Sequence, residues 1–399
     1  MTWEVKKLGE VCEIGAGNSA PQDTKMFDNG NYPFFRTSDV GQIHIGFIED
    51  SLDKLNVLGI KKLTLYKKGT LLFPKSGAST FLNHRVVMDV EGYVSSHLAT
   101  IKANNLILND RFLFYFSLGV DSRKLMQDQN YPSLRLSDIQ EIEIPIPPLL
   151  VQKRIVAILD KTFESIKQAK ENAEKNLENA NEIFESYLQS FFENKGEGWE
   201  EKTLMEVCEK ITDGTHQTPT YYNDGIIFLS SRNVTSGKIN WEKIKYIDKK
   251  QHLEMHKRVA PRINDILLAK NGTTGVAAMV DKDITFDIYV SLALLRPLDT
   301  LLPSFLLYFI NSPSAKKQFN KRLKGMGVPN LHLEEIREVV IPFPKSIKEQ
   351  QLIVKKFDKL STQTKQLEAI YEKKLANLEE LKKSILQKAF NGELIEVSA

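Results

Sequence analysis

The sequence predicts an α+β protein with two mixed α/β globular domains and two long helices, arranged as a tandem repeat. Three observations support this prediction: the second half repeats the first in order, each half opens with short apolar runs, and each half closes with a heptad pattern. An internal repeat of this length constrains the fold of the whole chain, because each copy is expected to form the same unit. With 399 residues the chain is long enough for two or three domains.

The repeat consists of short strings that return in the same order while the polar stretches between them differ. The matched strings are WEVKKLGEVCEI (3–14) with WEEKTLMEVCEKI (199–211), GTLLFPKSGAST (69–80) with NDILLAKNGTTG (264–275), RFLFYF (111–116) with SFLLYF (304–309), and YPSLRLSDIQEIEIPIP (131–147) with VPNLHLEEIREVVIPFP (328–344). The two halves therefore share a framework and differ at their surfaces.

The globular domains are predicted at residues 1–148 and 196–345. In the first, TLLF, VVMDV and EIEIPI are typical of strands, and NDRFLFYFSL is typical of a short amphipathic helix. Turn residues separate these runs, and no long helical period is present before residue 149. Each domain is therefore expected to be a mixed α/β unit.

The two long helices are predicted at residues 149–195 and 346–393. Apolar residues recur with heptad spacing in both: Ile155, Leu159, Thr162, Ile166, Ala169, Ala173, Ala180, Ile183 and Tyr187 in the first, and Phe357, Leu360, Thr364, Leu367, Tyr371, Leu378, Leu381 and Ile385 in the second. Asn and Gly residues end both segments. Because a compact domain must fit between the helices, we expect them to pack on each other as an antiparallel coiled coil.

A proline-rich string joins each domain to its helix. It reads EIPIPPLLVQKRIVAILD at 143–160 and VIPFPKSIKEQQLIVKKFD at 340–358. Proline lacks a backbone N–H and has a fixed φ, so these prolines are expected to end the strand and turn the chain into the helix.

Composition excludes several classes of protein. A net charge of +3 neither requires nor excludes a nucleic-acid partner, so a basic surface would have to be local. The two cysteines, Cys12 and Cys208, cannot form a disulfide framework, which favours a reducing compartment. No apolar run reaches the length of a membrane span, and the N-terminus does not resemble a signal peptide. The expectation is a soluble, cytoplasmic protein.

Taken together, these motifs resemble the DNA-specificity subunit of a type I restriction–modification system. The resemblance rests on the Trp-Glu…Leu-x-Glu-Val-Cys start and Ile-Pro-x-Pro end of each domain, on ITDGTHQTP, FLSSRNV and ILLAKNGTTG in the second domain, and on the terminal LKKSILQKAFNGEL. It covers essentially the whole chain, and the ordered repetition is more specific than any single motif.

The resemblance implies a non-catalytic subunit with defined partners. The globular domains would be target recognition domains, each reading one half of a bipartite site in double-stranded DNA. The helices would set the half-site spacing and dock two methyltransferase subunits, which bind the S-adenosylmethionine, so that no cofactor is expected on this chain. Restriction subunits would join the complex for cleavage. Flipping the target adenine would be the work of the methyltransferase.

Polar residues of the predicted loops are the candidates for DNA contact, because base edges are read by forked or planar donors and acceptors. The candidates are Arg36, Thr37, Ser38, Lys75, Ser76, Ser79, Thr80, Ser133 and Arg135 in the first domain, and Thr215, His216, Gln217, Ser231, Arg232, Asn233, Lys270, Asn271, Thr273, Thr274, Lys324 and Asn330 in the second. The alternative for each is a turn residue that satisfies the local backbone.

Two other functions compete with DNA recognition. A self-contained methyltransferase would need an adenine-holding Asn/Asp-Pro-Pro-Tyr motif, which is missing, and EIGAGNS at 13–19 is a weak match to a cofactor loop. A nuclease would need an Asp…Glu-x-Lys cluster, and the sequence has no clear one. A coiled-coil adaptor without DNA specificity would use the helices but leave the diverged polar loops unexplained. A metal site is not expected: the cysteines lack a nearby second ligand, and His252 and His256, though spaced i, i+4, do not form a His-Glu-x-x-His motif.

Overall fold

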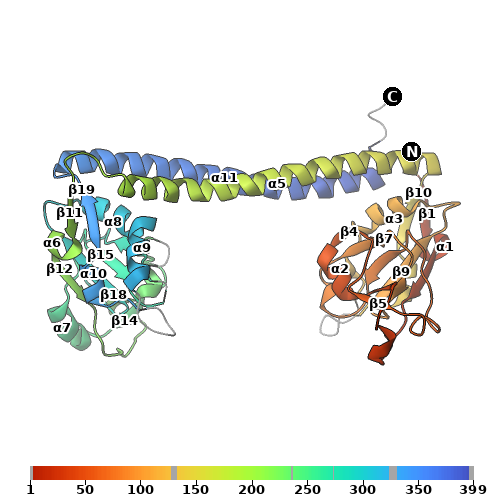
Figure 1. Cartoon of the computed structure of the whole chain (residues 1–399), viewed down its shortest axis with the longest axis horizontal. Coiled ribbons are helices and arrows are strands. Elements are labelled where there is room, and N and C mark those ends of the chain that lie inside the picture. Colours follow the sequence, from red (N-terminus) through yellow and green to blue (C-terminus); the bar gives the residue numbers. More distant parts are fainter. Residues whose placement is uncertain (1–2, 127–132, 235–236, 273, 323–329, 395–399) are drawn as a thin grey trace. The chain divides into compact units, whose positions relative to one another are not determined.

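The computed structural model describes residues 3–126, 133–234, 237–272, 274–322 and 330–394. The chain forms two compact units: unit 1 comprises residues 1–173 and 374–399, and unit 2 comprises residues 174–373 (Figure 1). Each unit contains one α/β domain and parts of both long helices. The predicted α+β class with two mixed domains and two long helices is confirmed.

Unit 1 is built on three sheets, with strand orders β2-β9-β6-β7-β4, β5-β3-β8 and β1-β10. The strands are β1 (Glu4–Lys7), β2 (Cys12–Ala16), β3 (Tyr32–Phe35), β4 (Ile45–Ile48), β5 (Asp53–Leu55), β6 (Leu71–Pro74), β7 (Arg85–Met88), β8 (Tyr93–Val94), β9 (Leu98–Ala103) and β10 (Glu143–Ile146). The helices are α1 (Leu8–Val11), α2 (Thr37–Ile43), α3 (Asp110–Ser117) and α4 (Leu136–Gln140), with short 3₁₀ turns η1 (Thr24–Met26), η2 (Ala78–Thr80) and η3 (Ser122–Lys124). The sheets are mixed, since β4 runs parallel to β7 whereas β6 is antiparallel to both β7 and β9.

Unit 2 repeats this plan with strand orders β12-β18-β15-β16, β14-β13-β17 and β11-β19. The strands are β11 (Glu200–Thr203), β12 (Cys208–Asp213), β13 (Ile226–Leu229), β14 (Lys245–Ile247), β15 (Ile266–Ala269), β16 (Ala277–Met279), β17 (Phe286–Ile288), β18 (Leu292–Pro297) and β19 (Val340–Phe343). The helices are α6 (Leu204–Val207), α7 (Lys249–Arg258), α8 (Pro303–Asn311), α9 (Pro313–Arg322) and α10 (Leu333–Arg337), with the 3₁₀ turn η4 (Ser231–Asn233). Cys12 and Cys208 both open a strand, as equivalent residues of a repeat should.

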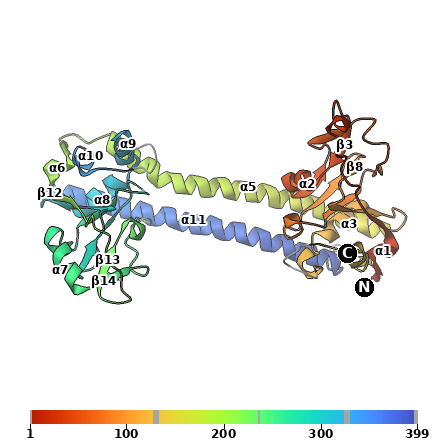
Figure 2. The ribbon, with the colours of Figure 1, turned by 90° about the horizontal axis from the view of Figure 1, so that it is seen from below.

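The long helices are α5 (Leu149–Glu193) and α11 (Ile347–Phe390). In unit 1, Lys382 of α11 lies over the ring of Phe163, and farther along α5 Lys170 pairs with Glu379, which comes earlier in α11. The two helix segments of unit 1 therefore run in opposite directions (Figure 2). In unit 2 the start of α11 meets the end of α5, where Phe357 is buried against Phe192.

The predicted heptad seam is only partly buried. Leu159, Ala173, Ala180 and Thr364 are almost fully enclosed, whereas the side chains of other predicted seam residues remain about 40 % exposed. The exposed members are Ile183, Tyr187, Leu367 and Leu381. Two helices enclose only the narrow line between them, so the flanks of a wider apolar stripe stay open.

The glutamine in each proline-rich string ties the helix to its domain. The amide of Gln152 accepts a hydrogen bond from the Asn109 N–H at 2.8 Å and donates to two carbonyls, those of Ile107 and Pro147, at 2.8 Å each. Gln350 repeats the pattern with the N–H of Leu302 and the carbonyls of Thr300 and Pro344. Both glutamines are fully buried, which explains why the string contains this residue twice.

The prolines of the string behave differently from the prediction. Pro145 and Pro342 lie within β10 and β19 and do not end them. Each of these strands pairs on one side only, with β1 or β11, so a missing N–H on the other edge breaks no ladder. Pro147 and Pro344 do follow the strand ends.

Among the described helices, none has both the length and the apolar composition to cross a bilayer.

Candidate nucleic-acid interface

The Lys75 loop of unit 1 lies beside the segment 133–135, which contains the candidates Ser133 and Arg135. Lys75 donates its N–H to the carbonyl of His97 at 3.0 Å, and its own carbonyl accepts from the Leu134 N–H at 2.8 Å. The next residue, Ser76, forms an isolated antiparallel bridge with Ser133. The structure thus brings together candidates that are far apart in the sequence.

Unit 2 has the same backbone geometry around Lys270. The Lys270 N–H donates to the Ser291 carbonyl at 3.0 Å, and its carbonyl accepts from the Leu331 N–H at 2.9 Å. Asn271 and Asn330 form the bridge that corresponds to Ser76 and Ser133. A serine pair in one unit therefore stands where an asparagine pair stands in the other.

The side chain of Lys270 is buried beside a carboxylate. Lys270 is 5 % exposed, and its Nζ lies 2.9 Å from the carboxylate of Asp213, the last residue of β12. Asp213 also accepts from Arg258 at 2.7 Å and faces His216 Nε2 at 3.3 Å. These four residues are called the Asp213 cluster below. Burial would raise the pKa of Asp213, but hydrogen bonds from Lys270, Arg258 and His216 outweigh it and hold the pKa below its usual value.

The position of Asp213 in the framework is occupied by an uncharged residue in unit 1. Gly17 and Gly214 occupy matching positions, since their N–H groups donate to Leu98 and Leu292 at the starts of β9 and β18. The residue before Gly214 is Asp213, and the residue before Gly17 is Ala16. The two units thus differ in charge at one matching position of a shared framework.

The Asp213 cluster borders a cavity of about 510 Å³ in unit 2. The segment 332–337 also lines it and adds both basic and acidic side chains. His216 and Arg258 expose more than half of their side chains, so they can meet a ligand while Asp213 holds them. The arrangement offers fixed cationic and imidazole donors, which suit phosphate oxygens and the acceptors of base edges.

The paired segments 36–38 and 231–233 contain different side-chain environments. Arg36 pairs with Asp53, and its guanidinium lies 5.1 Å from the Phe34 ring centre. Arg232 is exposed. Asn233 is buried, and its amide donates to the carbonyls of Asn240 and Lys243.

Three of the candidates are buried, although base contact requires an accessible side chain. Thr80, Asn233 and Lys270 are buried because they close their own loops or pair with a buried carboxylate. The candidates that are exposed or partly exposed are Arg36, Thr37, Ser38, Lys75, Ser76, Ser79, Ser133, Arg135, Thr215, His216, Gln217, Ser231, Arg232, Asn271, Thr274 and Asn330. Thr273 and Lys324 lie outside the described residues. DNA contact stays a prediction for every candidate.

Sequence reasoning missed Asp213 and Arg258. Asp213 stands inside the ITDGTHQTP string, so its position next to candidate residues was an available signal. Arg258 ends α7, where neither spacing nor neighbouring motifs distinguish it from other basic residues. The structure also brings Asp287 to His252 and His256, a set that could hold a metal ion.

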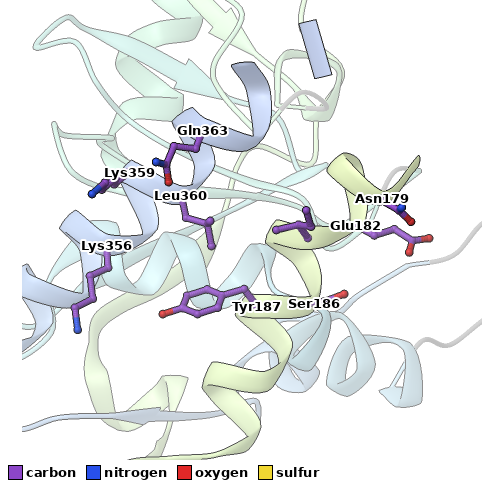
Figure 3. A pocket seen from close by; sticks show the side chains of 9 residues that line it. Asn179, Glu182, Ser186, Tyr187, Lys356, Lys359, Leu360 and Gln363 are labelled. Atoms are coloured by element: carbon purple, nitrogen blue, oxygen red, sulfur yellow. The ribbon is translucent and has the colours of Figure 1, made fainter. Parts of the chain in front are cut away.

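A groove between α5 and α11 is present in unit 2 (Figure 3). Its volume is about 720 Å³, and Ile183, Tyr187 and Leu360 supply its apolar lining. Lys356 and Lys359 stand on its α11 side, and Ile183 is 44 % exposed. Exposed apolar side chains in a groove with charged edges are typical of a surface that meets another protein.

Comparison with known proteins agrees with the repeat. The family model described as type I restriction modification DNA specificity domain matches residues 1–178 and again 196–379. The specificity subunit of type I restriction enzyme MjaVIII from Methanocaldococcus jannaschii is 23 % identical over 412 residues, which cover 98 % of this chain and 93 % of that protein.

Two solved structures share the fold. The HsdS subunit from Thermoanaerobacter tengcongensis superposes with a TM-score of 0.65 at 22 % identity, covering 98 % of this chain and 97 % of that one. A chain from a study of complex assembly and conformational transition in a type I restriction–modification system gives a TM-score of 0.79 at 22 % identity, covering 98 % of both.

Proposed function

The chain belongs to the family of type I restriction–modification DNA specificity proteins, and from this premise we propose that its two α/β domains read the two halves of one bipartite, asymmetric DNA site. It is the specificity component of such a system and not its catalytic component. The S-adenosylmethionine would be bound by methyltransferase subunits. Its work on DNA would take place in the cytoplasm.

The observation that supports this proposal is a repeated backbone with different side chains. Both units bring the loop after a central strand, β6 or β15, against the segment before a short helix, α4 or α10. Ser76 and Ser133 occupy that place in unit 1, and Asn271 and Asn330 occupy it in unit 2. Serine and asparagine offer different donors and acceptors, so the two halves of the site are expected to differ in sequence.

The long helices support the second part of the proposal, that they set the distance between half-sites and dock two methyltransferase subunits. A pair of packed helices resists bending, and half-site spacing in DNA recognition follows from the geometry of the protein that joins the readers. The groove that contains Ile183 and Leu360 is a candidate docking surface on unit 2. Restriction subunits would join the same assembly.

Methylation mapping tests the proposal. The chain is expressed with its methyltransferase partner in a host without adenine methylation, and modified positions are found by sequencing. We expect a bipartite motif with one methylated adenine in each half and a constant gap. A continuous motif would refute the two-reader proposal, and no methylation with a demonstrably active partner would favour the adaptor function.

Two matched substitutions refine the test. Arg36→Ala should relax sequence choice in one half-site, and Arg232→Ala should relax it in the other, because the two residues stand in paired segments of different units. If both substitutions relaxed the same half, the assignment of one half-site to each unit would be wrong.

A further inference from the structure

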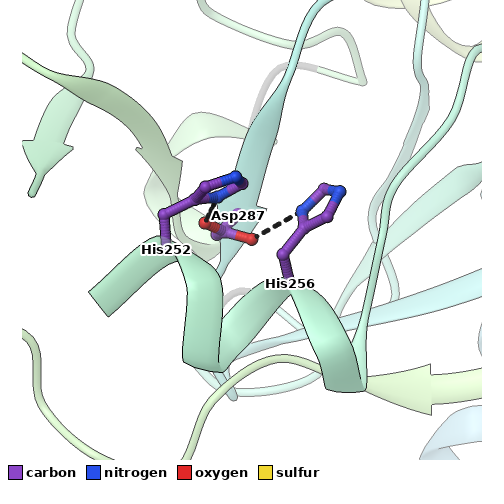
Figure 4. Close-up of side chains that lie close together, drawn as sticks. All are labelled: His252, His256 and Asp287. Carbon is purple, nitrogen blue, oxygen red and sulfur yellow. Dashed lines mark hydrogen bonds and ion pairs between the residues drawn. The ribbon is translucent and has the colours of Figure 1, made fainter. Parts of the chain in front are cut away.

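Helix α7 brings two imidazoles to a buried carboxylate in unit 2 (Figure 4). His252 and His256 are one turn apart on α7, and Asp287 comes from β17. His252 Nδ1 lies 2.7 Å from one oxygen of Asp287, and His256 Nδ1 lies 3.0 Å from the other. Asp287 is 1 % exposed, so both carboxylate oxygens are held away from bulk water.

The donor set and its size suit a divalent transition metal. The ligand atoms of the three residues lie within 4.8 Å of one another. In a tetrahedral zinc site, bonds of about 2.0–2.2 Å place neighbouring ligand atoms about 3.3 Å apart. The observed His–Asp separations of 2.7 and 3.0 Å would therefore have to widen by about 0.3–0.6 Å to admit the ion.

We propose that His252, His256 and Asp287 form a zinc-class metal site, with water completing the coordination. Imidazole nitrogen with carboxylate oxygen is a donor combination that Zn²⁺ and its neighbours in the first transition series accept, whereas Ca²⁺ and Mg²⁺ prefer oxygen alone. The ion would also compensate the charge of a carboxylate that has almost no access to water.

The site would fasten a helix that is otherwise held mainly by the polar contacts of Gln251 and Arg258. None of the residues of α7, all of which are described, is buried, and its one leucine, Leu253, is 55 % exposed. Apolar packing therefore contributes little to its position, and the contacts to Asp287 are its main attachment to β17. A metal bond through two residues of α7 and one of β17 would cross-link the helix to the sheet.

The same helix ends at Arg258, which belongs to the Asp213 cluster. Fixing α7 through His256 would thus also fix the guanidinium that Asp213 holds beside the cavity. This link to DNA recognition rests on the proposed function, whereas the metal site itself does not.

Direct metal titration of the full-length, untagged chain tests the site. After treatment with EDTA and its removal, Zn²⁺ binding is measured by calorimetry, and Co²⁺ is used as a spectroscopic probe. We expect the tightest site to bind one equivalent of metal per chain. Co²⁺ bound at this site should show the visible absorption of a tetrahedral complex. Thermal unfolding followed by circular dichroism should shift upward when Zn²⁺ is added.

Two variants and one control make the result decisive. His256→Asn and Asp287→Asn should weaken this binding at least about tenfold, because the loss of even an outer-shell partner costs ~10–100-fold. His332→Asn, which changes an exposed histidine of the same unit, should leave it unchanged. Because His256 is partly exposed, its variant should fold even if the Asp287 variant does not. Equal Zn²⁺ binding by the wild type and His256→Asn, or none by the wild type, would overturn the proposal.

These measurements contain no DNA. Failure of the metal site would therefore leave the proposed DNA recognition untouched, and a failed methylation map would leave the metal result standing.

Discussion

Replacing Gln350 with alanine should weaken the attachment of the start of α11 to the domain of unit 2. The side chain is fully buried and makes three hydrogen bonds, with the Leu302 N–H and with the carbonyls of Thr300 and Pro344. Each such bond has a net value of ~0.5–1.5 kcal/mol, and the backbone groups left behind would stay partly enclosed. The expected loss in the free energy of unfolding is therefore about 3 kcal/mol.

The adjacent glutamine is a matched control. Gln351 is exposed, so Gln351→Ala should change stability by less than about 0.5 kcal/mol. Urea unfolding gives the stability of each variant, and hydrogen exchange locates the effect. Exchange at the Leu302 N–H should rise in Gln350→Ala, because that N–H donates to the deleted side chain. If the two alanine variants were equally stable and Leu302 stayed protected, the explanation of the repeated glutamine would be wrong.

Four further predictions concern the Asp213 cluster, the thiols and the helices. Lys270→Ala should destabilise unit 2 by about 1–3 kcal/mol in urea unfolding, because it removes one of the three partners of the buried Asp213 carboxylate. The pKa of Asp213 is lowered in the folded state, so its contribution to stability is present above about pH 4 and is lost as pH falls below that value. Asp213→Asn should therefore flatten the loss of stability at acid pH. An unchanged pH profile of stability would contradict this role of Asp213. Burial raises the pKa of both Cys12 and Cys208 to about 12, so neither thiol should react with Ellman's reagent at pH 8 until urea is added; rapid reaction of the folded protein would refute this. Lengthening α5 near Ala173 and the facing part of α11 by two turns each, about seven residues, should change the gap of the methylation motif while both half-sites stay readable; an unchanged gap would refute the spacing role.

Much of the fold was predictable because it depends on local patterns that occur twice. The strands at 71–74 and 85–88, the helix at 110–117 and both long helices follow from apolar periodicity and from Asn or Gly residues that end them. The proline strings were harder, because a proline is compatible with a strand whose other edge is free, and pairing partners are not visible in the sequence.

The candidate site was predicted in outline but not in its side-chain chemistry. The KSGAST and KNGTTG strings were recognised as equivalent, and the structure gives their lysines equivalent backbone bonds to Leu134 and Leu331. The environments of the two lysine side chains differ, because the position of Asp213, which pairs with Lys270, is occupied by Ala16 in unit 1.

The sequence by itself determined the duplication, the family resemblance and the two helical segments, because each depends on residues close together in the chain or on their ordered return. Only the tertiary structure decided which polar residues meet. Asp213 reaches Lys270, and Asp287 reaches His252 and His256, across long stretches of chain, through strand pairing and helix packing. The burial of a carboxylate and the direction of an imidazole depend on that packing, so the spacing of residues in the sequence does not predict them.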